Sequence, residues 1–349
     1  MKAAKLFERN GNILICKACA RGCRLKDGQT GFCGVRKNID GKMYLLVYGK
    51  VAALHIDPIE KKPVTHYMPG TRILSIGTVG CSWACKYCQN YDLSQRRNIY
   101  GEEMSPEDLV NLAINENCEG IAYTYNEPSI YIEYAYDTGI LAHKKGIFNI
   151  FVSNGFYTEY TINMAKEFLD AITIDIKGNG ALKFLQENTL INDNKPIFDT
   201  LLALKDSGIH IEITDLVIPK IGDDLEEARK LTKFIYENLG PDTPVHFLRF
   251  FPEYKLSFLP PTPIETLEKH HKIARDSGLK YVYIGNVPGH PLENTYCPNC
   301  GRIVVERFGF DIIGWHLNDR NECEYCGYKL NIIGKKPDIS RDRNVEFIF

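Results

Sequence analysis

Strand-like and helix-like segments alternate along most of this 349-residue chain, and this alternation restricts the possible folds more than any other feature. Parallel strands need long crossover connections, whereas antiparallel strands can be joined by short turns. The alternation therefore predicts an α/β domain built on a parallel sheet. Seven short segments rich in apolar and β-branched residues are the predicted strands: 73–76, 121–124, 149–152, 172–176, 210–217, 245–250 and 281–284.

Two helix starts are recognisable between these strands. Ser105 is followed by Pro106 and, three residues after the serine, by Asp108, which is typical of a capped helix N-terminus. Thr158 is a second expected cap. We expect a long helix over residues 127–145, and a loop or short helix over residues 180–198, where the periodicity is weak.

The composition is that of an ordinary globular protein, with 44% hydrophobic and 25% charged residues. A formal net charge of −2 gives no electrostatic reason to expect nucleic acid or an anionic membrane as a partner. No segment is apolar over the roughly 18 residues that a membrane helix needs, and residues 1–10 lack the apolar core of a signal peptide. We therefore expect a soluble, cytoplasmic protein.

Eleven of the twelve cysteines fall into three clusters. Cysteines in a reducing compartment rarely form disulfides, so this clustering indicates metal or redox chemistry. Cys118 is left over and is expected to be a plain buried thiol. The clusters are an N-terminal set (Cys16, Cys19, Cys23, Cys33), a central set (Cys81, Cys85, Cys88) and a C-terminal set (Cys297, Cys300, Cys323, Cys326).

The central set lies in the loop Cys81-Ser82-Trp83-Ala84-Cys85-Lys86-Tyr87-Cys88, which follows the first predicted strand. Three thiolates at this spacing can ligate three irons of a [4Fe-4S] cluster and leave the fourth iron without a protein ligand. An open position suits chemistry, by analogy with catalytic zinc sites. The alternative is a zinc site whose fourth ligand lies elsewhere. Because the other two sets can each close their own site, the open cluster is favoured.

The C-terminal set is a pair of CxxCG knuckles separated by 22 residues, which is a zinc-ribbon pattern. Their glycines allow tight turns, and residues 303–306 form a predicted strand between them. An iron-sulfur centre is the alternative. The N-terminal set lies in glycine-rich residues 12–37, and its four thiolates suit either zinc or an auxiliary cluster.

The chain is predicted to have three parts. Residues 1–66 would form the N-terminal four-cysteine knuckle and a hairpin, in which residues 43–48 pair with residues 51–56. The polar, proline-bounded residues 57–63 are predicted to be a linker or surface loop. Residues 67–290 would form the α/β core, and residues 291–349 a zinc-ribbon-like module.

Polar or turn-forming residues follow every predicted strand. Tyr125-Asn126-Glu127-Pro128 follows the second strand, Ser153-Asn154-Gly155 the third, and Asp175-Ile176-Lys177 ends the fourth. A helix cap or a turn would explain any one of these motifs. The carboxyl ends of parallel strands meet at one face, where catalytic residues gather, so the succession predicts an active site beside the cysteine loop. His290, after the last strand, could face this site or be a hydrogen-bonded structural residue.

The CxxxCxxC loop, with an aromatic residue before its last cysteine and βα units after it, resembles the radical S-adenosylmethionine (SAM) superfamily. Further motifs resemble the radical enzyme of the AmmeMemoRadiSam system, which is similar to pyruvate formate-lyase activating enzymes. These motifs are CSWACKYCQN, TYNEP, SNG, DIK, VIP, residues 281–294 and TYCPNCG. The resemblance covers nearly the whole chain, including the first knuckle and residues 57–63.

The resemblance implies a partial (β/α)6 TIM-like barrel and a [4Fe-4S] cluster whose open iron binds SAM. Reductive cleavage of SAM would give a 5′-deoxyadenosyl radical that abstracts hydrogen from a substrate. The motif that contacts the methionine amino group falls on Tyr125, Asn126 and Glu127, although the usual sequence there is Gly-Gly-Glu. The implied SAM contacts are Tyr87, Tyr125, Asn126, Glu127, Asn154, Asp175 and Lys177.

The resemblance also implies partners: an electron donor of the flavodoxin or ferredoxin type, and the Memo-family and Amme-family proteins, one of which could present a protein substrate. In the first knuckle, Ala20-Arg21 stands where related sequences often carry Pro-His, but no cysteine is lost. Two alternatives remain: an enzyme that activates a glycyl-radical enzyme, and a non-catalytic zinc-binding adaptor.

Overall fold

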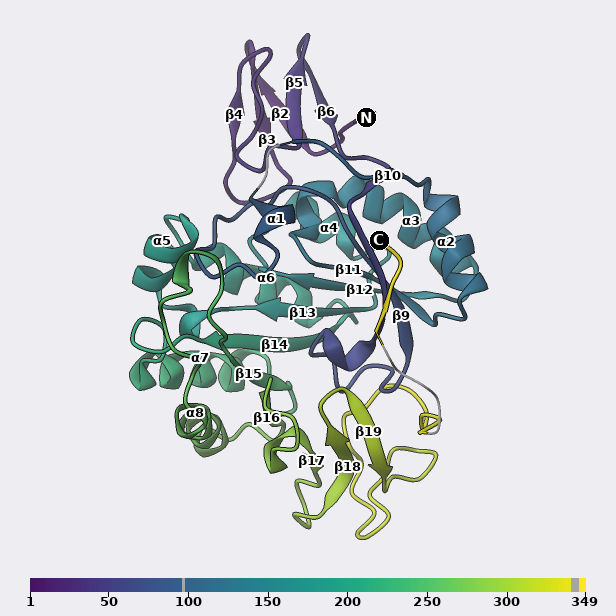
Figure 1. Ribbon diagram of the computed structural model, residues 1–349, viewed down its shortest axis with the longest axis vertical. Helices are drawn as coiled ribbons and strands as arrows, with labels where there is room; N and C mark the ends of the chain where they lie inside the picture. The colour runs from purple at the N-terminus through teal and green to yellow at the C-terminus, as the bar shows by residue number, and fades with distance from the viewer. Residues whose placement is uncertain (96–97, 340–344) are drawn as a thin grey trace.

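The computed structural model describes residues 1–95, 98–339 and 345–349. Its centre is a nine-stranded sheet in which seven parallel strands lie side by side in chain order (Figure 1). The parallel α/β domain predicted from the alternation is therefore confirmed. The seven strands are β9 (Arg72–Gly77), β11 (Gly120–Tyr123), β12 (Phe148–Ser153), β13 (Ala171–Asp175), β14 (His210–Val217), β15 (Val245–Arg249) and β16 (Val282–Gly285).

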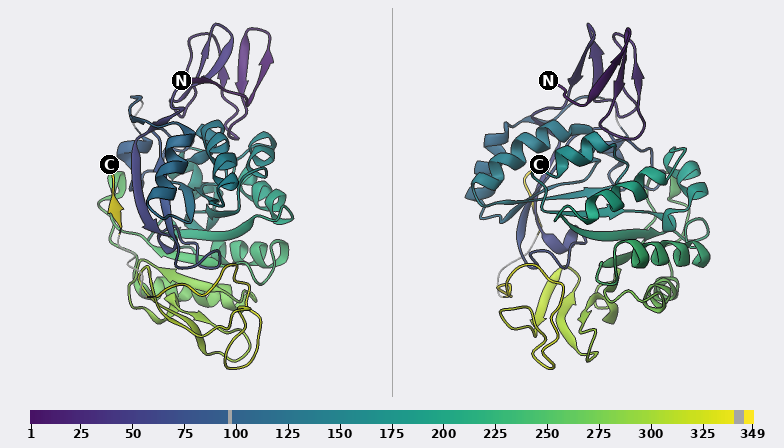
Figure 2. Two further views of the ribbon diagram at one scale, coloured as in Figure 1. Left: turned by 90° about the vertical axis from the view of Figure 1, so that its right-hand side faces the viewer. Right: turned by 180° about the vertical axis from the view of Figure 1, so that it is seen from behind.

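Amphipathic helices connect these strands and cover the sheet, as the view from behind shows (Figure 2). In α7, for example, Ala228, Leu231 and Ile235 are buried at helical spacing. None of the helices in the described ranges is long and apolar enough to cross a membrane. The helices after the parallel strands are α1 (Tyr91–Ser94), α2 (Pro106–Asn115), α3 (Ile132–Lys144), α4 (Glu159–Ala165), α5 (Leu182–Thr189), α6 (Lys195–Lys205), α7 (Leu225–Asn238) and α8 (Ile264–Asp276).

The predicted helix starts agree with the structure. Ser105 and Asp108 form a reciprocal capping box, and the Thr158 side chain accepts a hydrogen bond from the Thr161 N-H. The long helix expected over residues 127–145 divides into a short 3-10 turn (Pro128–Tyr131) and α3. The weakly periodic residues 180–198 contain the short helix α5 and the start of α6.

Two antiparallel strands extend the sheet beyond β9. Strand β8 (Ala53–Pro58) pairs with β9, and β20 (Glu346–Phe347) pairs with β8. The edges of the sheet are therefore β16 and β20, and no pairing among the described residues joins them. The result is an open, mostly parallel sheet.

The predicted hairpin of residues 43–48 and 51–56 is wrong. Strand β6 (Lys42–Leu45) pairs instead with β5 (Arg36–Ile39), and β7 (Lys50–Val51) pairs with β10 (Glu102–Glu103). Five of the six residues of β8 are buried, because that strand lies along β9 in the central sheet. Burying apolar residues against the core outweighs the local pairing that the turn signal predicted.

The prediction of a surface loop over residues 57–63 is also wrong. Asp57 is fully buried and Lys62 is 3% exposed. The Asp57 carboxylate accepts hydrogen bonds from the Lys61 and Lys62 ammonium groups. Charged residues can be buried when they pair with one another, and a local sequence pattern does not reveal that pairing.

The N-terminal module, residues 1–50, projects from the core at the top of Figure 1. It contains two small antiparallel sheets, made of β2 (Phe7–Asn10), β3 (Ile13–Cys16) and β4 (Arg24–Leu25), and of β1 (Lys2–Ala3), β6 and β5. Arg36 of β5 docks the module on α3, because it forms an ion pair with Glu133 in which the side chains are 1% and 2% exposed. Arg36 also donates to the Ile130 carbonyl oxygen at 2.8 Å.

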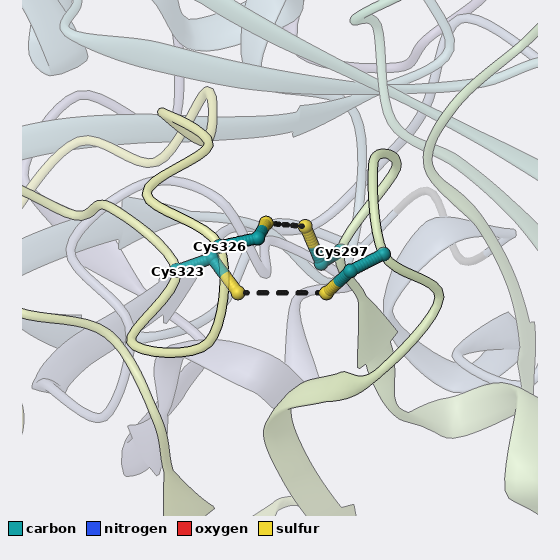
Figure 3. Close-up of side chains that lie close together, drawn as sticks. Cys297, Cys323 and Cys326 are labelled. Atoms are coloured by element: carbon teal, nitrogen blue, oxygen red, sulfur yellow. Dashed lines mark hydrogen bonds between the residues drawn. The ribbon is translucent and has the colours of Figure 1, made fainter.

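The C-terminal module contains a three-stranded antiparallel sheet of β17 (Thr295–Tyr296), β18 (Ile303–Phe308) and β19 (Asp311–Trp315). The strand predicted over residues 303–306 lies within β18. Trp315, Val304 and Leu330 belong to a buried cluster that also includes Tyr281 and Tyr283 of the core. The C-terminal set lies on two loops of this module that face each other (Figure 3).

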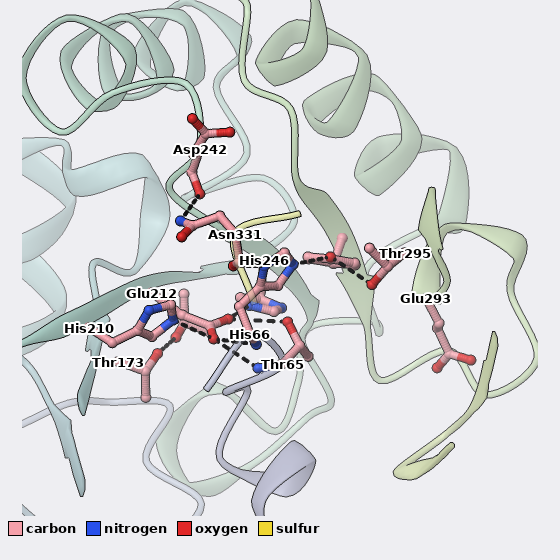
Figure 4. A network of polar contacts seen from close by, with 12 residues as sticks. Thr65, His66, Thr173, His210, Glu212, Asp242, His246, Glu293, Thr295 and Asn331 are labelled. Carbon is pink, nitrogen blue, oxygen red and sulfur yellow. Dashed lines mark hydrogen bonds and ion pairs between the residues drawn. The ribbon is translucent and has the colours of Figure 1, made fainter. Parts of the chain in front are cut away.

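A buried polar network attaches this module to the central sheet (Figure 4). The Glu212 carboxylate accepts hydrogen bonds from the Thr65 and His66 N-H groups at 2.9 and 2.8 Å, and lies 2.6 Å from His246 Nε2. His66 Nδ1 lies 2.7 Å from the Asn331 carbonyl oxygen in the C-terminal module. Burial lowers the pKa of His66 to about 3, so this histidine is neutral and its Nδ1-H can donate to that oxygen.

Replacing Glu133 with alanine should destabilise the protein by about 3–5 kcal/mol, because the change leaves the Arg36 charge buried without a partner. Anaerobic urea unfolding measures the loss. The matched control is Asp199→Ala, which removes one partner of the exposed Lys195–Asp199 pair and should cost less than about 1 kcal/mol. Equal losses for the two variants would contradict the role of the buried pair in docking the module.

Candidate active site

The loop of the central set forms one wall of a cavity of about 210 Å³ at the carboxyl ends of the parallel strands. Every residue that the sequence predicted to bind the cluster or SAM lines this cavity. The structure thus brings together residues from four strand ends, although they are up to about a hundred positions apart. They are Cys81, Cys85, Tyr87, Cys88, Tyr125, Asn126, Glu127, Asn154, Asp175 and Lys177.

The cysteine loop is held by the backbone of a neighbouring segment. The Ala84 and Lys86 N-H groups donate to the carbonyl oxygens of Thr189 and Asn188 at 3.0 and 2.9 Å. Cys88 Sγ lies 3.1 Å from the Ser94 hydroxyl. Burial raises the pKa of the Cys85 thiol to about 12, so a thiolate at neutral pH needs a cationic partner such as a metal.

The spacing of the three thiols fits a cluster better than a single ion. Among the described residues, the C-terminal set is the one group of metal-ligand side chains found close enough together to hold a single ion, and the central set is not such a group. In a cubane each thiolate binds a different iron, so the sulfur atoms stand farther apart than the ligands of one ion do. The residues present therefore fit a [4Fe-4S] cluster.

Asn126 joins the second strand end to the start of the cysteine loop. Its Nδ2 atom donates to Thr78 Oγ1 at 3.0 Å and to the Gly80 carbonyl oxygen at 2.9 Å, and its Oδ1 atom accepts from the Thr78 N-H at 3.3 Å. Asn126 is buried. Its side chain therefore positions the residues just before Cys81.

The conformation of Tyr125 shows how the chain accommodates a tyrosine at the first glycine of the expected Gly-Gly-Glu motif. Its φ angle is +67°, a left-handed conformation that glycine adopts easily and tyrosine rarely adopts. The Tyr125 hydroxyl donates to Asp57 Oδ2 at 2.8 Å, and the Lys62 ammonium lies 4.7 Å from the centre of the ring. These contacts hold the side chain while the backbone keeps the conformation of a glycine.

The ion pair of Asp57 and Lys62 contacts Tyr125 of the cavity wall and was not predicted from the sequence. Burial alone would raise the pKa of Asp57, but the two lysines hold that pKa well below its usual range. Burial lowers the pKa of Lys62 to about 8. The only signal in the sequence was the presence of two acidic and two basic residues within the proline-bounded segment 57–63.

Glu127 links the second and third strand ends. Its buried carboxylate accepts hydrogen bonds from the Asn154 and Ser129 N-H groups at 2.9 and 3.0 Å and from the Ser153 hydroxyl at 2.9 Å. Burial raises the pKa of Glu127 despite these donors. The same contacts place Asn154 at the cavity wall.

Lys177 supplies positive charge to the cavity. Its Nζ atom lies 2.9 Å from Asp175 Oδ2, and its φ angle is +63°. Burial alone would lower the pKa of Lys177, but Asp175 raises it above the usual value, so the ammonium stays charged. Asp215 lies nearby, and burial raises its pKa to about 7.

His290 is not among the residues that line this cavity. It caps the short turn Pro291–Glu293, where its Nδ1 atom accepts from the Leu292 N-H at 3.2 Å, and its Nε2 atom lies 3.3 Å from Glu268. Of the two alternatives for His290, the structure shows the hydrogen-bonded structural role.

The C-terminal set has the geometry of a single tetrahedral ion (Figure 3). All four ligand atoms lie within 4.8 Å of one another. Cys297 Sγ lies 3.6 Å from Cys326 Sγ, and Cys300 Sγ lies 3.8 Å from Cys323 Sγ. A metal-sulfur bond of about 2.3 Å gives a tetrahedral edge of about 3.8 Å. A hydrogen bond with Asn299 lowers the pKa of Cys326 to about 6, which favours the thiolate.

Comparisons with known proteins show similarity over the part of the chain that contains this site. Residues 75–235 match the model of the Radical SAM superfamily. An uncharacterized protein from Methanocaldococcus jannaschii is 43% identical over 338 residues, which cover 95% of this chain and 100% of the relative. A pyruvate formate-lyase-activating enzyme from Listeria monocytogenes is 27% identical over 179 residues, which cover 48% of this chain and 70% of that enzyme.

The fold has a counterpart among solved structures. A radical SAM methyltransferase from Sphaerobacter thermophilus aligns with a TM-score of 0.50 and 13% identity, covering 62% of this chain and 67% of that chain. Three cysteines at the carboxyl edge of an open parallel sheet are a ligand set that fits an iron-sulfur cluster. Residues 75–235, which carry the cysteine loop and most of the strand ends that line the cavity, are similar to the radical SAM superfamily.

Replacing Cys300 and Cys326 with serine should remove one metal ion per chain and loosen the C-terminal module, because two of four ligands are lost. Anaerobic metal analysis gives the stoichiometry and identifies zinc or iron. Fluorescence of the buried Trp315 reports on the module. Acid-labile sulfide should stay at the wild-type level, and a fall in sulfide would contradict a single-ion site.

Proposed function

We propose that this chain is a radical SAM enzyme that binds a [4Fe-4S] cluster through Cys81, Cys85 and Cys88. The observation that carries the proposal is the single cavity lined by these cysteines and by every predicted SAM contact. When bound, the cluster supplies one electron to the sulfonium of SAM, and the 5′-deoxyadenosyl radical released abstracts hydrogen from a substrate. The open sheet is interpreted as the partial (β/α)6 barrel of this superfamily.

Some residues of the cavity bind SAM directly in this proposal, and others position those residues. Lys177 supports the methionine carboxylate, because it is a charged ammonium facing the cavity. The backbone at Tyr125 receives the methionine amino group, and its left-handed conformation compensates for the missing glycine. Asn126 and Glu127 act as positioning residues, since their side chains bind neighbouring loops. Tyr87, which stacks on Phe184, and Asn154 complete the walls.

A second cavity supports a separate substrate. It has a volume of about 600 Å³ and shares Gln89, Leu248 and Asn286 with the first cavity. Its walls come from β15, β16, residues 60–65 and the β18–β19 turn of the C-terminal module, where Phe308 and Phe310 are exposed. A substrate here would reach SAM from the open edge of the sheet.

Arg307 suggests how this cavity could recognise a polar group. Its guanidinium is buried, and it donates to Thr295 Oγ1 at 2.7 Å and to the Glu293 carbonyl oxygen at 3.3 Å. In the described part of the chain, no ion pair neutralises it. We infer a largely apolar substrate with a polar end near Arg307.

The remaining features of the proposal follow from the cysteine spacing, the composition and the sequence resemblance. We propose zinc in the C-terminal set, an assignment to the AmmeMemoRadiSam subgroup, and the Memo-family and Amme-family proteins as partners. A flavodoxin or ferredoxin would supply the electron. A reducing cytoplasm would keep the cysteines available for metal.

Activation of a glycyl-radical enzyme is the second candidate. Its support is the similarity to the Listeria activating enzyme over 48% of this chain. Under this alternative, incubation with SAM and the correct partner would give a glycyl radical signal by EPR. The radical SAM chemistry would be unchanged.

The Cys85→Ala variant should lose about four irons and all 5′-deoxyadenosine formation, because one of the three cluster ligands is missing. The assay is chromatography after anaerobic incubation with SAM and dithionite. The matched control is Cys118→Ala, which removes a buried thiol outside the cavity and should retain full activity. A wild-type protein that holds zinc but no iron would support the adaptor alternative instead.

The Lys177→Met variant should bind SAM about thirtyfold more weakly, since the loss of a charge-assisted hydrogen bond costs about 2 kcal/mol. Equilibrium dialysis of the reconstituted protein with labelled SAM measures this change. Lys183→Met, an exposed position on the adjacent α5, is the control with the same chemical change. Wild-type affinity in both variants would exclude Lys177 as a carboxylate ligand.

A further inference from the structure

The N-terminal set lies directly against the cysteine loop of the active site. Gly80 packs on the backbone of Cys33 so closely that a Cβ atom there would lie 2.2 Å from the Cys33 carbonyl oxygen. On the other side of Cys81, Arg21 Nε donates a hydrogen bond to the Ser82 carbonyl oxygen. Because Arg21 lies between Cys19 and Cys23, the N-terminal and central sets are in contact on both sides of Cys81.

The N-terminal thiols lie near one another but are not a group at single-ion spacing. The four cysteines are electrostatic neighbours of one another, since Cys19 interacts with Cys16, Cys23 and Cys33. Within the described ranges, however, only the C-terminal set has its ligand atoms within 4.8 Å of one another. Neither the N-terminal set nor the central set is therefore a group at single-ion spacing, and four thiolates that do not close on one ion can instead bind the four irons of a [4Fe-4S] cluster.

Two arginines place positive charge beside these thiols. Arg21 interacts electrostatically with Cys19, Cys23 and Cys33, and also with Cys81 of the central set. Arg36 is buried and interacts with Cys16 and Cys33. Positive charge near a cluster stabilises its reduced form, which carries one more negative charge. Arg21 therefore links the two sites. It lies beside thiols of the N-terminal set and hydrogen-bonds to the cysteine loop of the central set.

The surface around the N-terminal set is basic. Residues 1–50 contain eleven lysines and arginines against three acidic residues, whereas the whole chain has 42 against 44. Arg24 and Lys26 are exposed immediately after Cys23. A surface of this charge attracts an acidic protein and speeds its encounter. The basic exposed residues are Lys2, Lys5, Arg9, Arg24, Lys26 and Lys42.

We propose that the N-terminal set holds a second [4Fe-4S] cluster that receives one electron from an acidic carrier protein and passes it to the cluster of the central set. The carrier loses one electron, the N-terminal cluster is reduced and then reoxidised, and the central cluster gains that electron. One electron thus enters for each SAM cleaved. The inference rests on the proposed function for its purpose, but the second cluster can be detected without SAM cleavage.

Iron and acid-labile sulfide analysis tests the second cluster. The reconstituted wild-type protein should contain about eight sulfides per chain, and the Cys85→Ala/Cys88→Ala variant about four. The reduced variant should still give a [4Fe-4S] EPR signal, which addition of SAM leaves unchanged. About four sulfides in the wild-type protein and none in the variant, with a second zinc ion in both, would overturn the proposal.

A substitution in the N-terminal set tests the same proposal in the opposite way, because it should remove the N-terminal cluster and leave the central one. Cys23→Ser should lose about four sulfides and keep the EPR signal of the central cluster, including its response to SAM. The retained response shows that the protein is folded. If Cys23→Ser retains all the sulfide of the wild-type protein, the N-terminal set does not hold a cluster.

Charge reversal tests the route of the electron. The Arg24→Glu/Lys26→Glu variant should be reduced about tenfold more slowly by an acidic reduced flavodoxin at low ionic strength. Its reduction by dithionite, a small molecule, should be unchanged. Lys233→Glu/Lys272→Glu makes the same charge change on α7 and α8, away from the N-terminal module, and should react like the wild-type protein (Figure 1). Equal slowing by both double variants would overturn the docking of the carrier at the N-terminal module.

Discussion

The hydrogen bonds of Asn126 are the interaction on which the arrangement of the active site depends. A parallel sheet brings strand ends to one edge, but it does not fix the loops that follow. Asn126 fixes one of them, because its buried amide joins the end of β11 to Thr78 and Gly80, just before Cys81. A buried polar group that loses its partners is costly, so this junction has one stable arrangement. The cysteine loop therefore takes its position from a neighbouring strand.

The sequence contained enough information to predict the sheet and the residues of the site. Periodicity is a local property, and the rule that parallel strands end at one face connected Cys81, Asn126 and Lys177 before any contact was known. The two errors, the hairpin of residues 43–48 and 51–56 and the loop of residues 57–63, concern the pairing of distant groups. Asp57 is buried in β8, where it pairs with Lys61 and Lys62 and also accepts a hydrogen bond from Tyr125, 68 positions away. A charged segment is predicted to be exposed unless such a partner is known.

The spacing of cysteines along the chain identifies the possible metal ligands, but it does not give the distances between their sulfur atoms in the folded protein. The N-terminal and C-terminal sets each offer four thiolates, and their sequences alone leave zinc and iron-sulfur clusters open for both. The folded chain separates them, since one set closes to a single-ion distance and the other does not. The two sets also differ in their neighbours: the C-terminal set lies beside a small apolar cluster of its own module, whereas Cys33 packs against Gly80 of the cysteine loop and Arg21 bonds to Ser82.

The buried pair of Arg36 and Glu133 has a consequence for the order in which the protein is assembled. The two residues are 97 positions apart, so the N-terminal module is synthesised well before α3 exists to receive it. At a synthesis rate of about 5–20 residues per second, that interval lasts roughly 5–20 s. During this time the four N-terminal cysteines are not yet covered by the core. The thiols proposed to hold the second cluster would therefore be accessible on the nascent chain, before docking covers them.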